Sequence, residues 1–159
     1  MEQDSSRRRF LAALGGGAAA LWFVDRFDAI EDAAAHAEHA TQAASTTQRR
    51  FEYFTAAEAR VADAIGARIM PSDDGTPGAR EAGAVYFMDR IAARHMPDDM
   101  KTSLREGLAT LAKDTAAKHA GARDFAALTS EQQDTLLRER QETPFFNIMR
   151  TLTLGGVLS

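Results

Sequence analysis

The sequence contains no cysteine among its 159 residues. This absence excludes a disulfide framework, thiolate-ligated iron–sulfur clusters, covalent haem attachment through a C-x-x-C-H motif and a cysteine nucleophile. Histidine is also scarce, because only His36, His39, His95 and His119 occur. The chain therefore offers few of the side chains from which metal centres and nucleophilic active sites are built.

A sustained alternation of apolar and polar residues between hairpin turns is also missing. Without that pattern a β-sheet is not expected, and the ordered part of the chain is predicted to be all-α. A strong charge imbalance is missing as well, since the formal net charge is −4 and charges of both signs are interspersed. This balance argues against a nucleic acid or an anionic membrane surface as the main partner.

The N-terminal segment carries the clearest motif in the sequence. Three arginines precede Phe10 and Leu11, and a weakly hydrophobic stretch follows over residues 12–24. The segment resembles the twin-arginine signal of exported bacterial proteins, with Arg7 and Arg8 as the pair. Residues 10–24 are 15 residues long, and a membrane-spanning helix needs about 17 to 25. We therefore predict a twin-arginine signal peptide over residues 1–35 and a periplasmic protein.

A linker or a frayed helix is expected after the signal. Residues 31–50 are rich in Ala, Thr, Gln and Ser and contain few large apolar side chains. Such a composition buries too little surface to offset the conformational entropy of the chain. Small-residue triplets at residues 33–37 make cleavage plausible there. We assign residues 36–50 to a linker and residues 51–159 to one helical domain.

A capping box predicts where the first helix of that domain begins. Thr55 and Glu58 have the spacing at which the threonine hydroxyl and the glutamate carboxylate each bind the other's backbone N–H. Pro71 then ends the helix, because proline biases the preceding residue away from helical geometry. One apolar stripe at helical spacing lies between these signals, formed by Val61, Ala62, Ile65 and Ile69.

Turn residues divide the rest of the domain into further helices. The turn-rich residues 72–78 are followed by a helical pattern over residues 79–95, and Pro97 then breaks the chain. Asp98 or Asp99 is expected to cap a third helix that ends near residue 121. A second capping box at residues 129–132 and a proline at the first position of the last helix complete the pattern. We predict a small bundle of about five helices.

Two clusters could carry metal or acid–base chemistry. His36 and His39 have the spacing of a metal-ligand pair, but a solvated polar patch in a linker explains them better. Asp73, Asp74 and Glu81 could hold calcium or act as an acid–base pair, but turn stabilisation and helix capping are favoured. We interpret the two remaining histidines as helix-end residues.

Two blocks of sequence carry a family resemblance. Residues 54–89 contain the run IMPSDDGTPGAREAG, and residues 145–156 read FFNIMRTLTLGG. Both blocks resemble the gluconate 2-dehydrogenase subunit 3 family, whose members commonly carry a twin-arginine signal. The resemblance implies that this chain contacts a larger subunit through residues of these blocks, namely Pro71, Asp73, Asp74, Thr76, Pro77, Gly78, Glu81, Gly83, Phe87, Phe145, Phe146, Leu152 and Gly155.

The resemblance also implies a function. The chain would be a non-catalytic small subunit of a sugar or sugar-acid dehydrogenase at the periplasmic face of the inner membrane, without a cofactor of its own. FAD would lie in a catalytic subunit of the glucose-methanol-choline oxidoreductase type, and haem c in a multihaem cytochrome. The twin-arginine translocase would be a further partner. The alternatives are a free-standing periplasmic binding or sensor module, and an enzyme or metal carrier that uses the clusters above.

Overall fold

The structure is a computed structural model, and it describes residues 50–159. Within this range the chain forms five α-helices, one short 3₁₀ helix and no strand, which confirms the predicted all-α bundle. The predicted signal residues Arg7, Arg8, Phe10 and Leu11, together with His36 and His39, lie outside the described residues. The elements are α4 (Ala56–Ile69), α5 (Ala84–Arg94), α6 (Asp98–Lys118), η1 (Phe125–Ala127), α7 (Ser130–Arg138) and α8 (Pro144–Leu158).

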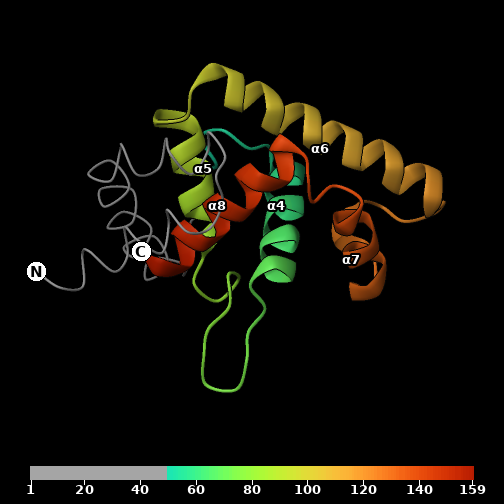
Figure 1. Cartoon of the computed structure of the whole chain (residues 1–159), viewed down its shortest axis with the longest axis horizontal. Coiled ribbons are helices and arrows are strands. Elements are labelled where there is room, and N and C mark those ends of the chain that lie inside the picture. Colours follow the sequence, from blue (N-terminus) through green and yellow to red (C-terminus); the bar gives the residue numbers. More distant parts are fainter. Residues whose placement is uncertain (1–49) are drawn as a thin grey trace, which may run out of the picture.

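The helices pack around α8. This helix contacts α5 most extensively, and it also packs against α6 and α4. The long helix α6 crosses one side of the bundle, and α7 lies beneath its C-terminal half (Figure 1). The core residues include Ile65 of α4, Phe87 and Ile91 of α5, and Met149 and Leu152 of α8, all of which are fully buried. The apolar stripes predicted from the sequence therefore meet in one core.

Local sequence signals set most helix ends. The Thr55 hydroxyl accepts a hydrogen bond from the Glu58 N–H at 3.2 Å, and the Glu58 carboxylate accepts one from the Thr55 N–H at 2.8 Å. The same reciprocal pair forms at Thr129 and Gln132, so both predicted capping boxes are confirmed. The histidines interpreted as helix-end residues are in those positions, since His95 is the C-cap of α5 and His119 that of α6.

Two predicted helix starts are wrong. The second helix begins at Ala84 rather than at residue 79, because Gly83 adopts a left-handed φ of 67° that interrupts the helical path, and residues 79–83 form turns instead. Glu81 consequently precedes the helix and does not lie in its first turn. The N-cap of α6 is Pro97, without a side-chain cap, and both Asp98 and Asp99 lie in the first turn.

A buried carboxylate fixes the segment that leads into the bundle. Asp89 of α5 is 5% exposed. Its two oxygens accept hydrogen bonds from the backbone N–H groups of Glu52, Tyr53 and Phe54 at 2.8, 2.9 and 2.9 Å. Charge-assisted hydrogen bonds of this kind are about twice as strong as neutral ones. Residues 52–54 are therefore tied to α5 before α4 begins.

One close approach between helices requires a glycine. The ring of Phe145 in α8 lies over Gly107 of α6, where a Cβ atom would come within 2.1 Å of the ring. A residue with a side chain at position 107 would therefore displace the start of α8.

Candidate partner interface

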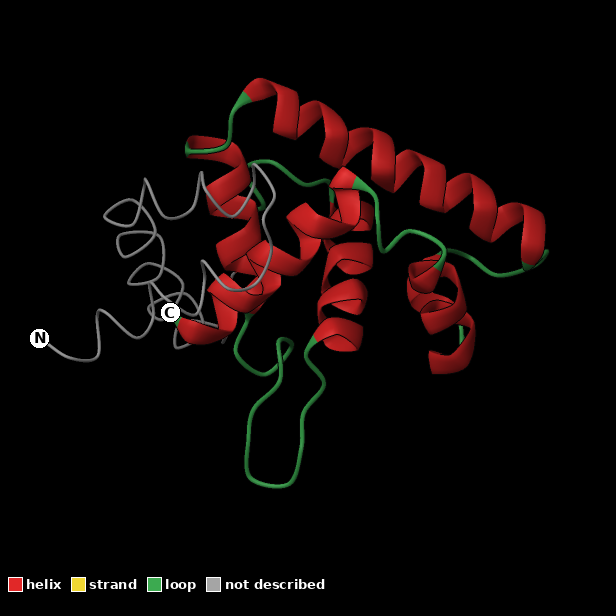
Figure 2. Cartoon of the chain, viewed as in Figure 1, coloured by secondary structure: helices red, strands yellow, loops and turns green. Residues whose placement is uncertain are grey.

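The loop between α4 and α5 projects from the bundle and ends in a tight turn (Figure 2). Asp73 and Thr76 pair through two backbone hydrogen bonds of 3.1 and 2.9 Å. Gly75 lies between them with a φ of 91°, in the left-handed region that favours glycine. We call residues 71–77 the finger, and all seven are exposed. The finger thus has a defined shape and presents its side chains to the surroundings.

The base of the finger is fixed by polar contacts. The Arg80 guanidinium binds the Asp63 carboxylate of α4 at 2.8 Å. The Ser72 hydroxyl donates a hydrogen bond to the Glu81 carboxylate, and this bond holds the pKa of Glu81 below its ordinary value. The side chain of Glu81 therefore stabilises the base of the finger, rather than the start of α5.

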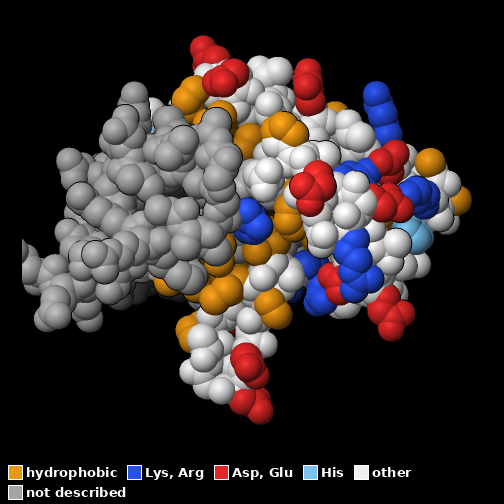
Figure 3. All heavy atoms as spheres, in the orientation of Figure 1, with side chains coloured by type: hydrophobic (Ala, Val, Ile, Leu, Met, Phe, Trp, Pro, Cys, Tyr) orange, Lys and Arg blue, Asp and Glu red, His pale blue; other side chains and the backbone are white. Residues whose placement is uncertain are grey.

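Carboxylates lie at the tip of the finger. Figure 3 shows acidic side chains at the far end of this projection. One Asp73 oxygen accepts a hydrogen bond from the Asp74 N–H at 2.7 Å, which confirms the predicted turn-stabilising role for Asp73. Among residues 50–159, no group of three or more Asp, Glu or His side chains is arranged to hold a metal ion. Asp73 and Asp74 are both exposed, so the tip presents an acidic surface.

The predicted interface residues fall into two groups. Six are exposed on the finger or at its base, and Phe146 is half-buried in α8. The other six lie inside the fold, and among them Phe87 and Leu152 are 0% exposed and hold the core together. The partner interface stays a prediction. Its exposed members are Pro71, Asp73, Asp74, Thr76, Pro77 and Glu81, and its buried members are Gly78, Gly83, Phe87, Phe145, Leu152 and Gly155.

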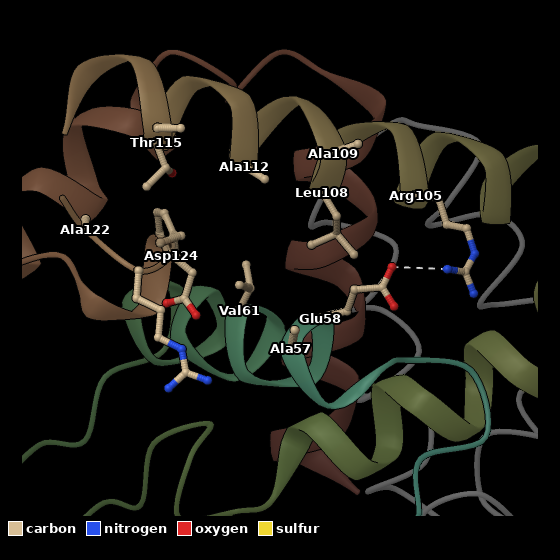
Figure 4. Close-up of a pocket in the computed structure, with 13 residues that line it drawn as sticks. Ala57, Glu58, Val61, Arg105, Leu108, Ala109, Ala112, Thr115, Ala122 and Asp124 are labelled. Carbon is tan, nitrogen blue, oxygen red and sulfur yellow. Dashed lines mark hydrogen bonds and ion pairs between the residues drawn. The ribbon is translucent and has the colours of Figure 1, made fainter. Parts of the chain in front are cut away.

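A second surface feature was not predicted from the sequence. A groove of about 280 Å³ runs between α4 and α6 and reaches η1 (Figure 4). Its apolar lining consists mainly of small side chains, and three of these, Ala109, Ala112 and Ala116, are exposed on one face of α6. Their spacing of three and four residues was the available signal, but alanine marks an apolar face only weakly.

Ion pairs flank this groove at both ends. At one end Arg105 binds Glu58 at 3.1 Å and lies 4.4 Å from the centre of the Tyr53 ring. At the other end Arg60 pairs with Asp124. Burial pushes the pKa of Asp124 upward, but the hydrogen bond and charge of Arg60 outweigh this effect and leave the pKa below its ordinary value. Glu58 and Asp124 thus each already have an arginine partner within the chain.

No helix within the described residues combines the length and apolar character needed to cross a membrane. Neither the curated proteins nor the solved structures yield a match to this chain. The family model described as gluconate 2-dehydrogenase subunit 3 matches residues 56–159, the range that begins with α4 and contains the five α-helices of the described part of the chain. The chain therefore belongs to the gluconate 2-dehydrogenase subunit 3 family.

Proposed function

We propose that this chain is the non-catalytic small subunit of a periplasmic, flavin-dependent sugar or sugar-acid dehydrogenase of the gluconate type. It binds the folded catalytic subunit, escorts it through the twin-arginine export route and stabilises it afterwards. The catalytic subunit is a flavoprotein of the glucose-methanol-choline type that holds FAD. A multihaem cytochrome c accepts the electrons, and the complex lies at the inner membrane.

Family membership over residues 56–159 is the observation that carries this proposal. The family is described as a subunit of a dehydrogenase, so a partner subunit is part of the description itself. The finger supports the proposal, because an exposed turn held in one conformation loses little entropy when a partner binds it.

The predicted signal gives a further reason for the escort role. The twin-arginine route carries folded proteins, and a small helical domain without a cofactor has no chemical need for it. A flavoprotein that binds FAD before export does have that need. The signal on this chain is therefore best explained as serving the complex, and the catalytic subunit then travels without a signal of its own.

Conservative substitution of the arginine pair tests the escort role. We expect Arg7→Lys with Arg8→Lys to lower the amount of periplasmic flavoprotein at least tenfold, measured by immunoblotting of fractionated host cells. The chain contains a matched control pair at Arg49 and Arg50, and Arg49→Lys with Arg50→Lys should leave the distribution unchanged. Undiminished periplasmic flavoprotein in the first variant would refute the escort role.

Separate assay of the subunits tests the non-catalytic role. The purified chain should not reduce a dye acceptor with gluconate or glucose as substrate, whereas the flavoprotein complex should. Turnover by the purified chain without any second subunit would show that the chain is itself an enzyme.

A further inference from the structure

We propose that the groove between α4 and α6 receives an amphipathic helix of the catalytic flavoprotein, with an acidic side chain placed over Arg123. This inference rests on the proposed function and adds a location and a chemistry for the contact. The groove is separate from the finger, so the partner would contact this chain at two places.

The dimensions of the groove suit a helix. The residues of α6 that line it extend from Arg105 to Ala116, which corresponds to about 16 Å, or three helical turns, at 1.5 Å per residue. Figure 4 shows Arg105 and Thr115 toward opposite ends of this stretch, with Val61 and Ala57 of α4 along the other side. A trough between two helices is the usual receptor for an amphipathic helix.

The lining also suits a helix. Exposed alanines of α6 line the groove, and their short side chains allow the main chain of another helix to approach closely. The one buried hydroxyl among the lining residues is satisfied, because Thr115 donates a hydrogen bond to the Leu111 carbonyl at 2.8 Å. Large apolar side chains of a partner could therefore cover this surface without leaving that hydroxyl unpaired.

The charges specify an acidic residue on the partner. Glu58 with Arg105, and Asp124 with Arg60, are neutralised as ion pairs. Arg123 lines the same groove, is exposed and forms no ion pair with any residue in the range 50–159. The remaining charge at the groove is positive, so a carboxylate on the incoming helix complements it.

The natural lack of cysteine allows a direct test in the full-length chain. Ala112→Cys places a single thiol in the groove, and Ala117→Cys places one at an exposed site of α6 that does not line it. The rate of maleimide modification is measured for each variant alone and in the purified complex with the flavoprotein. We expect at least tenfold slower modification of Ala112→Cys in the complex and a change below twofold for Ala117→Cys.

Charge variants test the acidic contact separately. Arg123→Glu should weaken binding of the flavoprotein at least tenfold and Arg123→Lys less than threefold, measured by interferometry, with circular dichroism confirming the helical fold of both variants. Equal affinities of these two variants would overturn the charge assignment.

The outcomes distinguish this inference from the proposed function. If the complex forms but Ala112→Cys reacts as fast as in the free chain, the groove is not the docking site and the subunit role stands. If the thiol of Ala112→Cys is modified as slowly in the free chain as in the complex, something other than the flavoprotein covers the groove. Mass spectrometry that locates residues 1–49 or a fatty acid there would identify that occupant and overturn the inference. If no flavoprotein complex forms, the proposed function fails and this inference fails with it.

Discussion

The bundle core and the two surface features are built in different ways. Where α5 packs on α8, large side chains such as Phe87 and Leu152 are fully buried, and Asp89 satisfies three backbone N–H groups. The finger and the groove instead present exposed small or charged side chains, and backbone hydrogen bonds fix the conformation of the finger. Substitutions in the first region should change stability, whereas those in the second should change association.

The largest effect is expected at Asp89. Asp89→Ala leaves three N–H groups without their acceptor, of which the Phe54 N–H is buried and the other two are part-buried. Because a buried unsatisfied donor costs about 1 to 3 kcal/mol, we expect the free energy of unfolding to fall by at least about 2 kcal/mol in urea denaturation. Asp99→Ala, in the exposed first turn of α6, should cost below about 1 kcal/mol. Equal losses for both variants would show that the buried carboxylate is not an anchor.

A smaller loss of stability is expected at Gly107. Alanine there gains about 1 kcal/mol of helix propensity, but its Cβ would lie 2.1 Å from the Phe145 ring. Because overpacking costs typically about 1 to 3 kcal/mol, we expect a net loss of up to about 2 kcal/mol in thermal or urea unfolding. Thr110→Ala, at an exposed position of the same helix, should be neutral or slightly stabilising. A gain in stability for Gly107→Ala would mean that α8 yields easily at its start.

The finger provides the opposite test. Asp73→Asn with Asp74→Asn should change the free energy of unfolding by less than about 0.5 kcal/mol, because both side chains are exposed. Affinity for the flavoprotein should fall about tenfold, or roughly 1.4 kcal/mol, and the difference should shrink at high salt. Titration calorimetry at two salt concentrations measures this. Unchanged affinity at low salt would remove the finger from the interface.

The smallest effect concerns the ion pair that joins α4 to α7. Arg68 binds both oxygens of Asp134, at 2.7 and 2.8 Å, and this hydrogen bonding lowers the pKa of Asp134 from its ordinary value of 3.8. Asp134→Asn should cost about 1 kcal/mol or less at neutral pH. A lowered pKa stabilises the fold above the unfolded pKa, and the contribution disappears as the pH falls through the folded pKa. The free energies of unfolding of the natural chain and of Asp134→Asn should therefore converge as the pH is lowered from about 7 to about 2.5. A difference that stays constant over this range would show that the ion pair is not its cause.

The sequence predicted the elements that depend on neighbouring residues. Thr55 and Thr129 are recognisable as helix starts because a capping box involves positions only three residues apart. Pro144 is recognisable because its missing N–H has no cost in the first helical turn. The apolar spacing within each helix similarly identified most of the core.

The parts that depend on distant residues were missed. Asp89 reads as an ordinary polar residue, and only the folded chain brings residues 52–54 to it. The late start of α5 was missed as well, because the sequence does not reveal that Gly83 adopts a left-handed φ of 67° and interrupts the helical path before Ala84. The groove was missed because it is formed by two helices together, and neither helix carries it alone.

The three hydrogen bonds that converge on Asp89 have a mechanical consequence. A pulling force applied ahead of residue 52 would reach α5 through these bonds, and it would not peel α4 away turn by turn from Thr55. Since α5 packs more extensively on α8 than on any other helix, the tension would be shared by the two best-buried helices of the bundle. The hydrogen bonds to Asp89 therefore oppose mechanical unfolding that starts at the N-terminal side of the domain.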